Sequence, residues 1–232
     1  MKGIKVLIKG CIPCFSAVGI MYAVLFFLVC MLQLCFGVMT QEAYLDLVTD
    51  ANVMLIATGC AYVVYMIVFY RWFQRLKNMT FSERISTKIK AWDCVCLISL
   101  GIVLQMLVSF LLAWILPHFP KVYQMYQQLL DGLIQEGSWL SFLITTILAP
   151  IGEELIFRGV TIALLEKELP YFVLNFLQAF LFGLYHMNVV QFVYAFGIGL
   201  ILGLVYKKYN NLKACMLVHG TINLCANLLS VI

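Results

Sequence analysis

Seven apolar stretches separated by short polar segments organise this chain of 232 residues. They are 17 to 29 residues long, and an α-helix needs roughly 20 apolar residues to cross a bilayer. Hydrophobic residues make up 64% of the sequence and charged residues only 11%, whereas a soluble domain carries about 25% charged residues. The pattern therefore predicts an all-α, polytopic integral membrane bundle of about seven to eight transmembrane helices, forming a single transmembrane domain over residues 1–232. The apolar stretches are residues 11–39, 52–73, 91–116, 138–165, 171–187, 189–206 and 212–232.

The positions of the basic residues predict how these helices are oriented. Cytoplasmic loops of membrane proteins carry an excess of lysine and arginine. The segment that carries Glu42, Asp46 and Asp50 contains no base and is expected on the outer face. We therefore expect a multi-pass protein of the cell membrane with a cytoplasmic N-terminus, in contact with bilayer lipid and with no nucleic-acid partner. The basic clusters are Lys2, Lys5 and Lys9, six bases between Arg71 and Lys90, and Lys207, Lys208 and Lys213.

Two segments depart from simple membrane spans. Residues 121–135 combine helical spacing with mixed polarity, which is typical of a helix lying at the membrane interface. Residues 187–195 include Asn188 and Gln191 between two apolar stretches. This second segment is expected to form either a short outer turn or a dip into the membrane, which is tolerated only where it lines protein or water.

The fourth apolar stretch contains three ionisable residues, Glu153, Glu154 and Arg158. An ionisable group at the bilayer centre costs from ~2.5 to ~15 kcal/mol, so three within six residues indicate a role. Glu154 and Arg158 are four residues apart and can pair on one helix face, either as a structural brace or as part of a site. Glu153 is rotated by about 100° from Glu154 and must have a different role. Pro150, one turn earlier, predicts a kink or a water-filled widening.

Two further pairs of residues, each four positions apart, lie in later apolar stretches. A single histidine or asparagine in a span is more often a packed, hydrogen-bonded core residue than a catalyst. Glu153, however, has no local cation once Glu154 pairs with Arg158. We therefore expect Glu153 to face these later residues across helix boundaries. The pairs are Phe182 with His186 and His219 with Asn223, whereas the third histidine, His118, lies between prolines in a loop.

The motifs Glu153-Glu154-x-x-x-Arg158, Phe182-x-x-x-His186 and His219-x-x-x-Asn223 resemble, in this order, those of the CPBP intramembrane protease family. That family includes the type II CAAX prenyl endopeptidases and the bacteriocin-immunity (Abi) proteins. The resemblance covers residues 138–232, a motif-bearing protease core, and matches no motif in the first three spans. It implies an intramembrane endopeptidase that hydrolyses a peptide bond in a membrane-associated peptide or protein, which is prenylated in the CAAX branch of the family.

The resemblance also implies a role for each motif residue, with no cofactor. Glu153 would be the base that activates water, and His186 would help to orient that water. His219 and Asn223 would donate hydrogen bonds to the oxyanion. The supporting residues would be Glu154, Arg158 and Phe182.

Three alternatives use the same residues. Glu153, His186 and His219 form a His2Glu set that could hold a catalytic zinc ion with water as its fourth ligand. A non-catalytic bacteriocin self-immunity or membrane scaffold protein would keep the motifs for structure alone. A small proton-coupled transporter would use Glu153 and the histidines as a proton relay, although the chain shows no repeated halves.

Overall fold

The computed structural model describes residues 2–36, 40–77, 89–135 and 139–230. These residues are helical apart from short turns, so the predicted all-α class is confirmed. The first half contains α1 (Lys2–Phe36), α2 (Gln41–Thr49), α3 (Ala51–Lys77), α5 (Ala91–Ile115), the 3-10 turn η1 (Leu116–His118) and α6 (Pro120–Gln135). The second half contains α7 (Trp139–Leu143), η2 (Ile144–Leu148), α8 (Ala149–Glu154), η3 (Leu155–Thr161), α9 (Ile162–Leu165), α10 (Tyr171–Tyr185), α11 (Val189–Tyr209) and α12 (Leu212–Ser230).

Six helical segments of the described chain are long and apolar enough to cross a membrane. One of them is the run from Trp139 to Leu165, in which α7, η2, α8, η3 and α9 follow one another without a break. The fifth apolar stretch, residues 171–187, forms α10, which has 15 residues and is about 22 Å long, shorter than the hydrocarbon core. The predicted count of seven to eight is therefore approximate, with six long helices and one short one.

Both segments that departed from simple spans have a defined structure. Residues 121–135 lie within α6, so a helix is present where an interfacial helix was predicted. Between α10 and α11 the chain makes a tight turn, in which Met187 has a φ of 54°. Asn188 then caps α11, because its side chain accepts hydrogen bonds from the backbone N–H groups of Val190 and Gln191. The expected turn is thus present at 186–188, and α11 begins directly after it.

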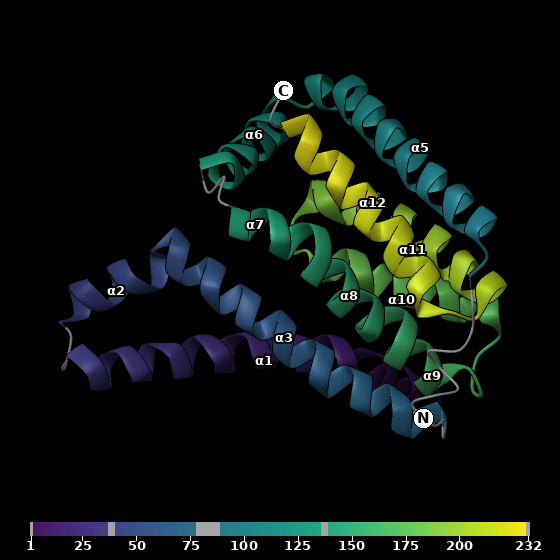
Figure 1. The fold of residues 1–232 in the computed structure, drawn as a ribbon, viewed down its shortest axis with the longest axis horizontal. Coiled ribbons are helices and arrows are strands. Elements are labelled where there is room, and N and C mark those ends of the chain that lie inside the picture. The colour runs from purple at the N-terminus through teal and green to yellow at the C-terminus, as the bar shows by residue number, and fades with distance from the viewer. Residues whose placement is uncertain (1, 37–39, 78–88, 136–138, 231–232) are drawn as a thin grey trace.

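The helices form an open bundle around the run 139–165 (Figure 1). Helices α1 and α3 pack against one side of this run, α12 packs between it and α5, and α10 pairs with α11. Large apolar side chains such as Phe15, Phe26, Trp92, Phe110 and Phe172 are exposed. Exposed aromatic groups of this size are expected of a surface that faces lipid rather than water.

The two ends of the bundle differ in charge. At one end, Lys9 pairs with Glu168, and Lys77 donates to Glu166 at 2.7 Å, which ties α1 and α3 to the turn that follows α9. Lys208 and the other bases at the junction of α11 and α12 lie at this same end (Figure 1). We call it the basic end, and we call the opposite end, where α6 lies, the α6 end. Residues 78–88 of the predicted basic loop lie outside the described residues.

Candidate active site within the membrane bundle

The helix that carries the first motif is interrupted by two π-helical stretches, η2 and η3, on either side of α8. At the first of them the Ala149 N–H donates to the Ile144 carbonyl five residues earlier. In this register the Thr145 carbonyl would pair with residue 150, which is proline and has no N–H. Asn223 on α12 takes that place, because its Nδ2 donates to the Thr145 carbonyl at 2.9 Å. A π-helical stretch thus directly precedes α8, and the carbonyl that Pro150 leaves without an N–H is bound by Asn223.

Glu154 and Arg158 form the ion pair that their spacing predicted. Arg158 Nη1 lies 2.8 Å from Glu154 Oε1, and both side chains are 0% exposed. The same Oε1 also lies 2.8 Å from Nδ1 of His219 on α12. Because a carboxylate only accepts hydrogen bonds, Nδ1 of His219 must carry the proton in this contact. Glu154 therefore fixes the ring of His219 as well as neutralising Arg158.

Arg158 is held in turn by α10 and α11. Its Nη2 donates to the Gly199 carbonyl at 3.2 Å, and Nε2 of Gln178 donates to the same carbonyl at 3.0 Å. The guanidinium carbon lies 4.5 Å from the centroid of the Phe182 ring, which is a cation–π contact. Phe182 of the second motif thus helps to desolvate and position Arg158.

Glu153 has a different set of contacts. Tyr62 on α3 donates to Glu153 Oε1 at 2.8 Å, and Glu153 Oε2 lies 3.7 Å from Nε2 of His219. His219 therefore lies between the two carboxylates, with one ring nitrogen toward each. Gly152 allows this arrangement, because a Cβ at that position would lie 2.8 Å from Cδ1 of Tyr62.

The sequence did not identify Tyr62 as a partner of Glu153. It lies in the second span, where no family motif was matched, and its apolar ring fits an ordinary membrane helix. A usable signal was nevertheless present, because the hydroxyl group of a buried tyrosine needs a hydrogen-bond partner. Tyr62 and Tyr65 lie three residues apart on one helix face, and the Tyr65 hydroxyl donates instead to the Ala17 carbonyl at 2.8 Å.

His186 lies farther from Glu153 than the sequence suggested. Its ring and that of His219 both contact Phe182, with centroid distances of 5.0 and 5.6 Å to the Phe182 ring. Nδ1 of His186 lies 2.8 Å from the Phe182 carbonyl, so Nδ1 carries the proton and Nε2 is the acceptor in the neutral ring. Of the three expected partners, His219 approaches Glu153, whereas His186 and Asn223 lie on the neighbouring cavity.

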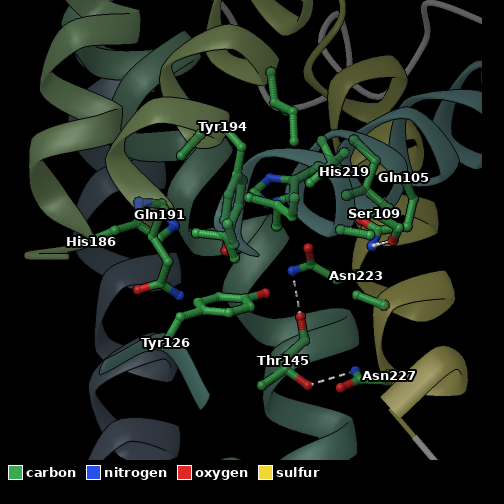
Figure 2. Close-up of a pocket in the computed structure, with 18 of the residues that line it drawn as sticks. Gln105, Ser109, Tyr126, Thr145, His186, Gln191, Tyr194, His219, Asn223 and Asn227 are labelled. Atoms are coloured by element: carbon green, nitrogen blue, oxygen red, sulfur yellow. Dashed lines mark hydrogen bonds between the residues drawn. The ribbon is translucent and has the colours of Figure 1, made fainter. Parts of the chain in front are cut away.

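A cavity of about 520 Å³ lies between α5, α6, α10, α11 and α12. Its walls include the rings of His186 and His219 and the amide of Asn223 (Figure 2). Glu153 adjoins this cavity through His219 and is itself 5% exposed. The second and third motifs therefore converge on one cavity, and the carboxylate of the first motif lies next to it.

The proposed zinc ligands are not gathered into a metal site. Across the described residues, no group of three or more histidine, cysteine, aspartate or glutamate side chains is arranged to hold a metal ion. In His219 both nitrogens face carboxylates, and Nδ1 of His186 faces a backbone carbonyl. Zinc binding would therefore require Glu153, His186 and His219 to rearrange.

The fold and this cluster define a multi-pass, all-helical membrane protein with a buried acid–histidine site. Residues 135–225 match the sequence model of the type II CAAX prenyl endopeptidase Rce1-like family. The match over this segment confirms the resemblance to CAAX-type intramembrane proteases that the motifs indicated. No curated protein and no solved structure was found to match the chain.

Proposed function

We propose that this protein is a membrane-embedded endopeptidase in which Glu153 activates water to hydrolyse a peptide bond. The observation that carries the proposal is the position of His219. Its ring lies between Glu153 and Glu154 and also forms part of the wall of the cavity that His186 and Asn223 line. Residues from separate helices thus bring two imidazoles and an amide to one cavity and a carboxylate next to it, within the segment that matches the family.

Tyr62 determines which oxygen of Glu153 would act as the base. Its hydrogen bond engages Oε1, so Oε2 is the oxygen that faces His219. The 3.7 Å between Oε2 and Nε2 of His219 is too long for a direct hydrogen bond and suits a water molecule that contacts both. In the reaction, Oε2 takes a proton as the water oxygen bonds to the scissile carbonyl carbon. The proton then passes to the amide nitrogen as the carbon–nitrogen bond breaks.

The remaining motif residues have roles consistent with their contacts. His186 would orient the water through Nε2, because its Nδ1 is engaged by the Phe182 carbonyl. Asn223 uses one amide N–H on the Thr145 carbonyl, and we assign its second N–H to the developing oxyanion. His219, when protonated at Nε2, would be the other donor. It would also balance the charge of the buried cluster, which otherwise holds two carboxylates and one guanidinium.

We further propose that the whole chain acts as one transmembrane domain in the cell membrane, with a cytoplasmic N-terminus. The contact between Tyr62 and Glu153 joins the first half of the chain to the protease core. The basic residues gathered at one end of the bundle support the orientation. The substrate would be a membrane-associated peptide or protein, and no metal or cofactor is required by the proposed reaction.

The decisive experiment compares membrane peptides from cells that express the native protein or its Glu153→Gln variant. Replacing the base should lower cleavage about 100- to 10,000-fold, with the amount of inserted protein unchanged. His186→Ala should act in the same direction, whereas His118→Ala is its matched control. His118 makes the same kind of contact to a carbonyl four residues earlier, that of Trp114, but it is exposed and is not among the residues that line the cavity.

Two experimental outcomes would contradict the proposed mechanism. Full cleavage by Glu153→Gln would reject the glutamate mechanism and favour the non-catalytic immunity or scaffold role. Loss of cleavage with a chelator and its recovery with zinc would assign Glu153, His186 and His219 to a metal site instead.

A further inference from the structure

One face of α10 carries three polar side chains that bind helix α11. Tyr171, Asn175 and Gln178 are four and three residues apart, so they lie on one side of the helix. The Tyr171 hydroxyl and the side-chain amides of Asn175 and Gln178 each donate a hydrogen bond to a backbone carbonyl of α11, and both amide bonds are 3.0 Å long. The acceptors are, in the same order, the carbonyls of Gly203, Leu200 and Gly199. We call Tyr171, Asn175 and Gln178 the α10 seam.

Two glycines of α11 allow α10 to approach closely enough for these hydrogen bonds. A Cβ at Gly203 would lie 1.7 Å from Oδ1 of Asn175, and a Cβ at Gly199 would lie 3.1 Å from Cα of Ala179. Atoms of α10 therefore occupy the space that larger residues of α11 would fill. Oδ1 of Asn175 also accepts a hydrogen bond from Gln178 at 2.8 Å, so the two amides hold each other in place. The seam thus fits α11 where Asn175 lies over Gly203.

The length of α10 leaves its depth in the membrane to its contacts with other helices. A helix that spans the hydrocarbon core is held at its depth because its apolar length matches the thickness of the bilayer. With 15 residues, α10 is about 22 Å long against a core of about 30 Å, so this match does not fix where it lies. Helix α11 has 21 residues and is long enough to span. Hydrogen bonds to α11 therefore give α10 a depth that its own length does not.

The depth of α10 determines where the second motif meets the other two. Phe182 lies one turn beyond Gln178 on α10. Its ring centroid is 4.5 Å from the guanidinium carbon of Arg158 and 5.6 Å from the ring centroid of His219. Gln178 and Arg158 also donate to the same Gly199 carbonyl. A slip of α10 along α11 by one helical turn, about 5.4 Å, would move the Phe182 ring away from both of its partners.

We propose that the α10 seam is a positioning element, which sets the register of α10 on α11 and thereby holds Phe182 and His186 beside His219. The inference rests on the proposed function and adds three positioning residues that belong to none of the motifs. None of the three is among the residues that line the cavity, so they act through the motif residues on the same helix. Gln178 has the central part, because its acceptor carbonyl also binds Arg158.

Cysteine crosslinking measures this register directly. The ring centroids of Phe176 and Phe196 are 5.3 Å apart, and those of Phe180 and Phe192 are 5.5 Å apart. A slip of one turn would instead bring together positions 176 and 192, or positions 180 and 196. Each pair is replaced by cysteine in the otherwise native chain and oxidised in membranes with a copper–phenanthroline complex. Helices α10 and α11 contain no native cysteine, so mass spectrometry of the linked peptides identifies each product.

The test variant combines Asn175→Leu with Gln178→Met, which removes both amides and nearly keeps their volume. The acceptor carbonyls keep the hydrogen bonds of their own helix, so the variant should insert and fold. We expect the slipped pairs to crosslink in this variant and not in the native chain. Cleavage that depends on Glu153 should fall about 10- to 100-fold, because the motif residues are misplaced. Gln178→Met alone should change both readouts in the same direction, and it serves if the double variant does not accumulate.

Tyr171→Phe and Tyr209→Phe are a matched pair of milder variants. The Tyr209 hydroxyl donates to Asp93 on α5 at 3.2 Å, so its loss removes a tyrosine hydrogen bond from α11 without touching α10. Tyr171→Phe should increase crosslinking of the slipped pairs, whereas Tyr209→Phe should leave the native pattern. Equal patterns in the two variants would remove Tyr171 from the seam.

A rescue separates positioning from a general loss of stability. A disulfide between positions 176 and 196 in the double variant restores the native register, so it should restore cleavage, and a reducing agent should abolish the recovery. An unchanged crosslinking pattern in the double variant, or a shifted pattern with full cleavage, would overturn the inference. The crosslinks need no substrate, so a failure of the proposed function is seen separately. Full cleavage by Glu153→Gln, with a shifted pattern in the double variant, would reject the proposed function and still assign the register to the seam.

Discussion

Glu153 and Glu154 are neighbours on one helix, yet their surroundings are opposite in kind. Glu154 is fully buried and binds both Arg158 and His219 through the same oxygen. Glu153 has one hydrogen bond, from Tyr62, and its second oxygen lies 3.7 Å from a histidine that lines the cavity. The rotation of about 100° between adjacent helical residues turns Glu154 toward Arg158 and Nδ1 of His219, and Glu153 toward Tyr62 on α3.

The difference is consistent with the proposed division of roles, in which Glu154 serves structure and Glu153 serves chemistry. Glu154 and its partners hold the ring of His219 in place, so that Nε2 is presented to Glu153. The contacts of Glu153 leave an oxygen in position to bind water. Three variants test this division of roles, and they are taken here in order of decreasing expected effect.

Arg158→Met should have the largest effect, and it acts on stability. It leaves Glu154 as a buried carboxylate without its cation, which costs about 3–5 kcal/mol when one partner of a buried ion pair is removed. Thermal unfolding in detergent micelles should show this loss, whereas Glu153→Gln should unfold close to the native protein. Adding Glu154→Met to Arg158→Met should recover part of the stability, because the unpaired charge is then gone. A stable Arg158→Met protein would show that the two carboxylates do not differ as described.

Gly152→Ala should have the second largest effect. A Cβ at this position would lie 2.8 Å from Cδ1 of Tyr62, a ring atom that cannot move without shifting α3. Overpacking of this kind costs roughly 1–3 kcal/mol, and it should also lower cleavage by displacing the Tyr62 hydroxyl from Glu153. Gly159→Ala in the same helix is the control, because its nearest contacts would be ordinary ones at 3.5–3.6 Å. Equal effects of the two substitutions on unfolding and cleavage would contradict this account.

The sequence predicted the contacts of Glu154 better than those of Glu153. The pairing of Glu154 with Arg158 follows from their spacing of four residues on a helix, and such a spacing can be read directly from the sequence. The helical class and the positions of the apolar stretches follow from composition and length in the same way. The contact of Asn223 with the Thr145 carbonyl also has a local cause, because Pro150 removes the N–H, but the partner itself comes from a helix about 80 residues later.

The environment of Glu153 depends on how helices pack, which no local pattern states. Tyr62 reaches Glu153 because Gly152 permits α3 to approach, and the two glutamates share His219 because α12 crosses the run 139–165 at their level. Counting residues from the predicted helix ends would place His219, Glu153 and His186 at depths that differ by about 12 Å. His219 nevertheless lies beside Glu153, so the helices are offset relative to one another. Two residues at different distances from their helix ends can therefore lie at the same depth.

Tyr62→Phe should have the smallest effect of the three, and it acts on chemistry. It removes one hydroxyl group and leaves the ring against Gly152, so the helix contact remains. Losing a hydrogen bond worth about 1–1.5 kcal/mol should lower kcat about tenfold with little change in KM. Tyr65→Phe is the matched control, because it removes a buried hydrogen bond one turn away that ends on the Ala17 carbonyl. Both variants should lose similar stability, so a lower kcat for Tyr62→Phe alone would assign its hydroxyl to the positioning of Glu153. Equal kcat values for the two would make Tyr62 a packing residue and leave the orientation of Glu153 to His219.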